Sequence, residues 1–351
     1  MDGFMYVVDV KSLKTTTLYP TMERDKQIDT MKAWLIFFVV LGHMIELTPS
    51  LASSVLHNFI YSFHMPAFIF IAGMFSKATN VDKSAYRIVR GVLVPLIVFT
   101  LIYEMVWFYK TLTFPSMFTK ALQPFWILWF LASLLIWRLT APLLSIAIYP
   151  LTTSIFISIV VMIYSGYVSE FSLTRSVYFL PFFMLGYLYG DKVVNKINLL
   201  SFNRPIAIPA LSLLLLTVTS YYAHSGISSG KVSFVDMKLD TLSGLTSVFL
   251  LYASFILALV FLLRISSVTT KLSVIGSRSI NIYLWHGVVI YGFSSLINKE
   301  YVYSNPEVSV SIALISSLLL TYILSARIVD YVTKILQAPF DYLLIKTAKK
   351  D

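Results

Sequence analysis

The sequence predicts an all-α, polytopic integral membrane protein with about ten transmembrane helices. Of its 351 residues, 58% are hydrophobic and only 13% are charged, whereas charged side chains make up about one quarter of a soluble domain. The mean hydropathy of +0.79 is correspondingly high. At about 1.5 Å per residue, a helix needs roughly 20 apolar residues to cross about 30 Å of hydrocarbon, and about ten stretches approach that length.

The expected spans follow one another with short connections. Arg138 and Pro142 interrupt the fourth span, and the sixth span barely reaches the minimum length. Apart from the N-terminal arm, no polar segment much exceeds about 20 residues, so a soluble second domain is not expected. In chain order, the expected spans are residues 33–49, 55–75, 91–109, 124–145, 150–167, 176–190, 205–223, 241–263, 280–298 and 308–327.

The distribution of Lys and Arg predicts that both termini lie in the cytoplasm. With the N-terminus inside, about 21 of the 27 basic residues fall on the cytoplasmic side, as the positive-inside rule requires. Residues 1–30 then form a cytoplasmic arm, residues 31–328 the membrane domain, and residues 329–351 a cytoplasmic basic tail. The arm mixes acidic and basic side chains and lacks an apolar run, so no cleavable signal peptide is expected.

Charge and composition exclude several classes of function. The net charge of +10 follows from topology and favours contact with anionic lipid, and no soluble basic domain supports nucleic-acid binding. The absence of Cys excludes disulfides, zinc–thiolate sites and an acyl thioester on the enzyme. Because there is no Gly-x-Ser-x-Gly elbow, phosphate-binding Gly-rich loop or His-Glu-x-x-His motif, hydrolase, NTPase and zinc-protease functions lose support. We expect no bound metal and no resident cofactor.

The first span carries a row of polar side chains on one helix face. Asp29 and Lys32 lie at its cytoplasmic mouth, and His43 follows Lys32 after about three turns, roughly 16 Å further along the axis. A histidine at this depth is costly unless it pairs with a neighbouring helix or lines a pocket, where it is suited to act as a general base. Glu46 is placed to orient the imidazole or to serve as a second acid, and a metal pair with His43 is the less favoured alternative.

Two further histidines lie at membrane depth. His64 precedes Pro66 in "YSFHMPAFIFIAGMF", where the proline alone explains a kink, so a structural role and a pocket role stay open. His286 lies inside the ninth span, in "SVIGSRSINIYLWHGVVI". We therefore expect the first, second and ninth spans to share a pocket that contains His43, His64 and His286.

Basic and aromatic residues suggest how ligands are held. Arg87 and Arg90 lie one turn apart at the cytoplasmic start of the third span, which reflects either the positive-inside rule or a phosphate-binding fork. Trp129 is explained by an interfacial aromatic belt or by ligand stacking, and Arg175 is a lone basic residue on the outer side. The "GYLYG" run at residues 186–190 is typical of close helix packing.

Several motifs recur in a fixed order over nearly the whole chain from about residue 24. They are Asp29-x-x-Lys32 followed by ten residues and His43, "FHMPAFIFIAG", Arg87-x-x-Arg90 before "GVLVP", Trp129-Phe130-Leu131, "FLPFFMLGY" and "IGSRSINIYLWH". Together they resemble the acyltransferase 3 family of integral-membrane O-acyltransferases, and within it the branch similar to fucose 4-O-acetylases. Lys32 stands where the family usually has Arg, which keeps a point charge but not a bidentate donor. Ala72 stands where members commonly have Ser.

The resemblance implies a reaction. The acyl donor, most often acetyl-CoA, would enter from the cytoplasm, and the acceptor would be a sugar hydroxyl on a lipid-linked or cell-surface glycan. His43 would be the general base, with Lys32 and Asp29 in the catalytic set, and direct transfer or an acyl-enzyme both stay open. Arg87, Arg90 and Lys32 would bind the CoA. The remaining substrate-binding residues would be His64, His286, Tyr283, Glu46, Trp129 and Arg175.

The resemblance also implies a setting. Residues 31–328 would be an acyltransferase domain in the plasma membrane of a bacterium. The lipid bilayer, the acyl-CoA and the glycan would be its partners, with a second copy of the chain or other glycan-assembly proteins as further candidates. The rival interpretation is a transporter or flippase for a glycan or small solute, in which the intramembrane histidines form a proton relay.

Overall fold

The structure, a computed structural model, describes residues 25–48, 50–77, 81–113, 123–164, 166, 168, 170–222, 225–230 and 233–345. Within these residues all regular secondary structure is helical, which confirms the predicted all-α class. Residues 1–24 of the predicted arm and residues 346–351 of the predicted tail lie outside the described residues.

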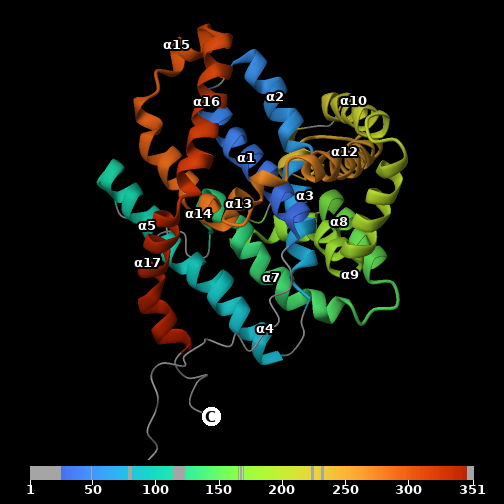
Figure 1. The fold of residues 1–351 in the computed structure, drawn as a ribbon, viewed down its shortest axis with the longest axis horizontal. Helices are drawn as coiled ribbons and strands as arrows, with labels where there is room; N and C mark the ends of the chain where they lie inside the picture. Colours follow the sequence, from blue (N-terminus) through green and yellow to red (C-terminus); the bar gives the residue numbers. More distant parts are fainter. Residues whose placement is uncertain are drawn as a thin grey trace, which may run out of the picture.

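Long helices joined by turns and short helical segments make up the molecule (Figure 1). The longer helices are α1 (Lys26–Leu47), α2 (Leu51–Tyr61), α3 (His64–Met74), α5 (Val94–Thr111), α7 (Trp129–Leu144), α8 (Pro150–Tyr164), α9 (Leu173–Asn203), α10 (Ala207–Tyr222), α12 (Thr241–Val268), α14 (Ser279–Phe293), α16 (Pro306–Leu324) and α17 (Arg327–Ile345). The shorter segments are α4 (Val81–Ile88), the π-turn η2 (Val89–Leu93), η3 (Trp126–Leu128), η4 (Glu170–Ser172), α11 (Ser225–Ser229), η5 (Thr270–Leu272), α13 (Ser273–Gly276), η6 (Ser294–Leu296) and α15 (Lys299–Ser304).

In the described residues, six helical segments are long and apolar enough to cross a membrane, and α8 and α10 are shorter apolar helices. Each predicted stretch coincides with a helix over most of its length, which supports a multi-pass membrane protein. The count of ten spans and the orientation of the termini stay predictions. The six segments are Lys26–Leu47, Ala52–Met74, Ser84–Thr111, Trp126–Leu144, Thr241–Val268 and Pro306–Leu324.

Helix α1 lies in the middle of the bundle (Figure 1). Asp25 caps its N-terminus, where one carboxylate oxygen accepts the backbone N–H groups of Gln27 at 2.8 Å and Ile28 at 3.2 Å. Its side chains are mostly buried, and it packs against α12, α13, α14 and α16. At α13, a Cβ on Gly276 would overlap the carbonyl oxygen of Asp29, so this approach of two backbones requires glycine.

Helices α3 and α9 pack backbone to backbone. A Cβ on Gly186 would overlap the carbonyl oxygen of Phe70, and a Cβ on Gly73 would overlap that of Phe183. One turn beyond Gly186, Gly190 faces the Met74 side chain in the same way. The structure thus confirms that "GYLYG" is a helix-packing motif.

The second predicted span is broken between α2 and α3. Ser62 and Phe63 form a turn just before His64, and Pro66 follows in the first turn of α3, where its missing N–H leaves the preceding turn without one helical hydrogen bond. The carbonyl oxygen of Ile60 accepts the N–H of Phe63 at 3.3 Å and the Nδ1–H of His64 at 2.7 Å. The break therefore turns the His64 ring back onto the end of α2.

The C-terminal segment is a helix rather than an irregular tail. Helix α17 follows α16 directly and packs against α5, η2 and α14. The side chain of Trp285 on α14 donates to the hydroxyl of Thr333 at 2.9 Å, and Asn281 donates to Asp330 at 3.2 Å. Residues 327–345 are thereby attached to the bundle along one face of the helix.

The close contact of α3 with α9 makes a stability prediction. Gly186→Val is expected to destabilise the protein by about 3 kcal/mol or more, because the new side chain overlaps the backbone of α3 and the helices must separate. The measurement is thermal unfolding of the purified protein in detergent. Gly292→Val is the matched control, since nothing lies within 4 Å of a Cβ at Gly292 on α14. Equal unfolding temperatures for the two variants would contradict the packing.

Candidate active site

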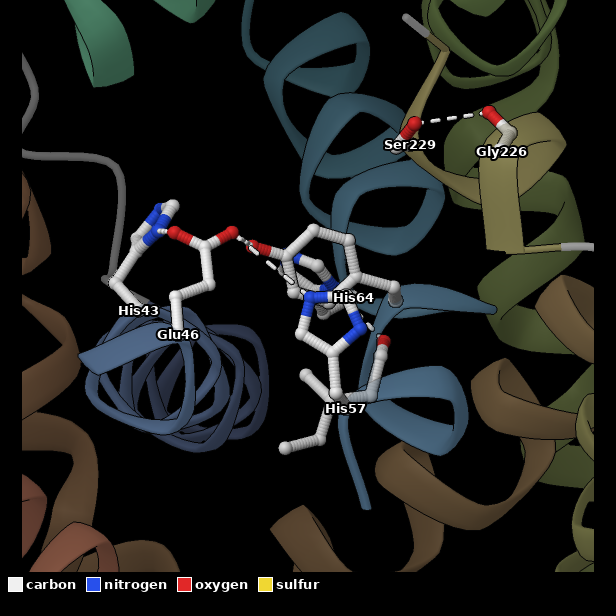
Figure 2. Close-up of polar contacts among 8 residues, drawn as sticks. His43, Glu46, His57, His64, Gly226 and Ser229 are labelled. Carbon is white, nitrogen blue, oxygen red and sulfur yellow. Dashed lines mark hydrogen bonds and ion pairs between the residues drawn. The ribbon is translucent and has the colours of Figure 1, made fainter. Parts of the chain in front are cut away.

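The imidazole of His43 is held by a carboxylate one helical turn away. His43 and Glu46 lie three residues apart on α1, and Nδ1 of His43 is 3.2 Å from Oε2 of Glu46. A carboxylate only accepts hydrogen bonds, so Nδ1 carries the proton and, in a neutral ring, Nε2 carries the lone pair. Figure 2 shows the Glu46 carboxylate between the rings of His43 and His57. This pairing leaves Nε2 of His43 as the basic atom of the ring.

The second carboxylate oxygen of Glu46 is held from α2. The hydroxyl of Tyr61 donates to Oε1 at 2.5 Å, and Nε2 of His57 lies 3.8 Å from the same oxygen. The ring of His57 stacks on the ring of Tyr61 with centroids 3.8 Å apart. Contacts on both oxygens fix the orientation of the carboxylate and therefore that of the His43 ring.

His286 on α14 lies against His43. The two rings stack with centroids 5.5 Å apart, and Trp126 meets the His43 ring edge-on at 4.8 Å. His286 is fully buried, and its Nδ1–H donates to the carbonyl oxygen of Ile282 at 3.0 Å. Its Nε2 has no hydrogen-bond partner in the part of the chain that the structure describes. The first and ninth predicted spans therefore meet at this pair of histidines.

A small pocket, which we call the outer pocket, is lined by His43 and His64 but not by His286, so only two of the three histidines expected in a shared pocket line it. Tyr61 contacts the His64 ring edge-on at 4.8 Å. Arg175 on α9 is 6% exposed and places its guanidinium 4.6 Å from the centre of the Trp129 ring. The outer pocket has a volume of about 30 Å³ and is lined by His43, Glu46, Tyr61, His64, Met65, Trp126, Trp129, Arg175, Ser228 and Ser229.

A much larger cavity, the inner cavity, lies at the predicted cytoplasmic ends of the helices. Its volume is about 650 Å³, enough for a sizeable part of a cofactor-sized ligand. Three cationic side chains line it: Arg90 in η2, Arg138 on α7 and Lys334 on α17. Between the cations and His43 its walls become apolar.

A narrow space of about 20 Å³, the throat, shares lining residues with both the inner cavity and the outer pocket. Phe68, Phe130 and Tyr283 line both the throat and the inner cavity. His43 lines both the throat and the outer pocket. Shared side chains therefore lead from the inner cavity, which the cations line, to the imidazole of His43.

The other predicted residues are distributed unequally around this path. Lys32 pairs with Asp29 at 2.5 Å and lies 5.2 Å from the centre of the Phe75 ring, and neither charged residue lines the inner cavity, the throat or the outer pocket. Arg87 is exposed outside the inner cavity, whereas Arg90 lines it.

The hydroxyl of Tyr283 donates to the carbonyl oxygen of Ile127 at 2.6 Å. Its proton is thereby committed to a backbone group. Tyr283 lines the throat and not the outer pocket, so its hydroxyl proton does not serve as a donor in the outer pocket.

Sequence reasoning missed several residues of the site. Tyr61 and His57 lie four residues apart on α2, and Tyr61 precedes His64 by three residues, so helical spacing was the available signal. Arg138 lines the inner cavity and donates from Nε to the Ser76 hydroxyl at 3.1 Å. Lys334 carried no signal beyond its place in a basic tail.

The fold and the site together define a multi-pass helical membrane protein with a carboxylate-oriented histidine in its interior. Residues 25–326 match a family described as an acyltransferase domain. Because this match covers most of the chain, the chain belongs to the acyltransferase 3 family, as the ordered motifs predicted. Membership indicates an acyltransferase that works in a membrane.

Two relatives are similar to half of the chain, and both carry the name nodulation protein NolL. The protein from Sinorhizobium fredii is 31% identical over 192 residues, which are 50% of this chain and 51% of the relative. The protein from Mesorhizobium japonicum is 26% identical over 202 residues, which are 49% of this chain and 50% of the relative. The chain therefore spans about half the length of these relatives. No solved structure matches.

The burial of the four described histidines predicts their order of chemical modification. Diethyl pyrocarbonate is expected to react with His43 and His57, whose side chains are 14% and 26% exposed, before it reaches His64 and His286, which are 2% and 0% exposed. Peptide mass spectrometry after timed exposure measures the order. Denatured protein, in which all four should react alike, is the control. Early modification of His286 would contradict its place behind His43.

Proposed function

We propose that the protein is an O-acyltransferase that moves an acetyl or another short acyl group from cytoplasmic acyl-CoA to a sugar hydroxyl of a lipid-linked or cell-surface glycan. One observation carries the proposal. His43, oriented by Glu46, lies where the throat from the inner cavity meets the outer pocket. A donor and an acceptor that arrive from opposite sides would meet at this ring.

The inner cavity suits the donor. Arginine guanidinium groups bind phosphate oxygens through paired N–H donors, and Arg90 and Arg138 line the cavity that the phosphates of CoA would enter. The apolar walls around Phe68, Phe130 and Tyr283 suit the pantetheine arm and lead its thioester towards His43. Because Arg87 is exposed beside η2, we assign it to long-range attraction of the anionic donor rather than to contact.

His43 would act as general base. Its Nε2 takes the proton of the acceptor hydroxyl, the hydroxyl oxygen attacks the thioester carbonyl carbon, and the C–S bond then breaks. The proton returns from the imidazolium to the CoA sulfur, so His43 ends neutral. Glu46 keeps the proton on Nδ1 and stabilises the imidazolium while it exists. Direct transfer therefore needs no acyl group on the enzyme.

The outer pocket suits the acceptor. Neutral His64 donates from Nδ1 to a backbone carbonyl, so its Nε2 atom accepts rather than donates a hydrogen bond. His286 does not line the outer pocket, so we assign it to packing against His43 rather than to contact with the acceptor. Arg175 supplies the fixed positive charge of this pocket, and Trp129 beneath it offers an aromatic face. We assign Arg175 to the acceptor and to the negative charge that develops during transfer. Asp29 and Lys32 line none of these spaces, so we assign them no contact with the reacting atoms.

The setting follows from the family and the relatives. We propose that the protein lies in the plasma membrane of a bacterium, since both relatives come from bacteria. A second copy of the chain and glycan-assembly proteins are further proposed partners. Transport of a glycan through the same interior has no separate observation in its favour.

Removing the base is expected to stop the reaction. His43→Ala should lower acyl transfer by at least about 100-fold without changing the unfolding temperature, since the hydroxyl then loses its proton acceptor. The measurement is release of CoA thiol from acetyl-CoA by protein in lipid, with and without envelope glycolipid. Full turnover by the variant would refute the assigned base. If the wild-type protein consumes no acyl-CoA, the transferase proposal itself fails.

The Glu46 carboxylate is expected to act through the ring proton of His43. Glu46→Gln should lower turnover by at least about 100-fold, because the amide N–H₂ group can donate to Nδ1 and move the ring proton to Nε2. Tyr61→Phe should have a smaller effect, of about tenfold, since the carboxylate stays. Glu300→Gln, at an exposed position on α15, is the control. Equal activity of the Glu46→Gln and Glu300→Gln proteins would contradict the orienting role.

A further inference from the structure

Helix α17 forms one wall of the inner cavity, although it lies beyond the residues that match the family. Its polar side chains point into the cavity at a helical spacing, whereas side chains such as Ile328, Tyr331 and Ile335 are exposed. The helix thus turns its polar face to the cavity and leaves apolar side chains exposed on another face. The cavity-lining residues of α17 are Asp330, Thr333, Lys334, Gln337, Ala338 and Asp341.

The charges of this wall are paired within the cavity. Nε of Arg90 lies 3.4 Å from a carboxylate oxygen of Asp341, and Lys334 donates to Asp330 at 2.6 Å. This bond holds the pKa of the Asp330 carboxyl below its usual range. Two of the three cations of the inner cavity are therefore occupied by carboxylates of α17.

An anionic ligand can replace the carboxylates in these two ion pairs at little cost. The Arg90 and Lys334 side chains are 54% and 67% exposed, and ion pairs with such exposure contribute little to stability. The other carboxylate oxygen of Asp341 is buried and has no hydrogen-bond partner within the described residues. A phosphate carries more negative charge and more acceptor oxygens than a carboxylate, so it competes well for the same cations.

We propose that α17 belongs to the donor site: Lys334 joins Arg90 and Arg138 in binding the phosphates of acyl-CoA, which replace Asp330 and Asp341 on these cations. The inference rests on the proposed function, because it needs an acyl-CoA donor. The two carboxylates then make the empty cavity less attractive to weaker anions. They set the affinity for the donor as well as the choice of anion.

Equilibrium binding of CoA tests the inference. The protein in nanodiscs of phosphatidylcholine is titrated with CoA in a calorimeter. Lys334→Ala should raise the dissociation constant about tenfold, since one charge-assisted contact is lost. Asp341→Asn and Asp330→Asn should each lower it about threefold, because a competing carboxylate is removed. Lys334→Arg should retain binding.

The control is an ion pair of similar exposure elsewhere. Asp191 pairs with Lys77 at 3.0 Å, and both side chains are exposed outside the inner cavity. Asp191→Asn should therefore bind CoA like the wild type. Unfolding temperatures measured without CoA show whether any variant has lost its fold, and the two aspartate variants with higher affinity must be folded to bind.

The outcomes separate this inference from the proposed function. If the wild type binds no CoA, the donor assignment fails and the proposed function with it. If the wild type binds CoA and the Lys334→Ala, Asp330→Asn and Asp341→Asn proteins bind it equally well, only the role of α17 is wrong. Weaker binding after Asp341→Asn would make Asp341 a direct contact and overturn the exchange. The same variants are compared for binding of phosphatidylglycerol in nanodiscs that contain this lipid. If Lys334→Ala weakens phosphatidylglycerol binding but not CoA binding, the cations belong to lipid headgroups and the inference is overturned too.

Discussion

The hydrogen bond between His43 and Glu46 determines what the interior of this protein can do. An imidazole in a low-dielectric interior can rotate and exchange its proton between two nitrogens unless a partner selects one of them. Here the carboxylate selects Nδ1, and Tyr61 fixes the carboxylate in turn. Because the Tyr61 side chain comes from α2, the orientation of a residue on α1 depends on how the second helix is packed. The chemistry of the site is thus tied to the packing of the bundle.

That packing is controlled by small residues where backbones come close. Gly276 lets α13 approach α1, and Gly73 and Gly186 let α3 approach α9. Without such contacts, helices in a membrane have little to hold them together, because lipid tails are as apolar as the helix surfaces. The same contacts bring His64 of α3 and Arg175 of α9 to the outer pocket, and Phe68 of α3 to the throat. The glycines at these close contacts therefore account both for the tight packing of the helices and for the geometry of the site.

Parts of the site that depend on helical periodicity could be predicted from the sequence. The spacing of His43 and Glu46 on one helix face is a local regularity, and their contact follows from it. The contact between His43 and His286 could be predicted only by assuming that the first and ninth spans are neighbours, and the structure confirms that these two side chains stack. Arg87 and Arg90 looked equivalent, but the π-turn at residues 89–93 and the packing of α17 separate them.

The remaining parts depend on long-range contacts that spacing alone does not reveal. His57 reaches Glu46 only because α2 lies beside α1. In the sequence Arg138 interrupts an apolar span, and only the fold shows that its side chain lines the inner cavity. Helix α17 was expected to be a basic tail. Its polar residues nevertheless recur at intervals of three and four, a pattern that gains meaning only when the cavity on that side is known.

The throat has an electrical consequence. In the predicted orientation, the inner cavity faces the cytoplasm and the outer pocket faces the other side, so the layer around Phe68, Phe130 and Tyr283 would be the insulation between them. A membrane potential falls mainly across the thinnest insulating layer, and about 2.3 kcal/mol is required to move one elementary charge through 100 mV. His43 lines both the throat and the outer pocket, so it stands at the edge of this layer. In the proposed reaction, the proton that His43 takes from the acceptor would therefore move within the membrane potential.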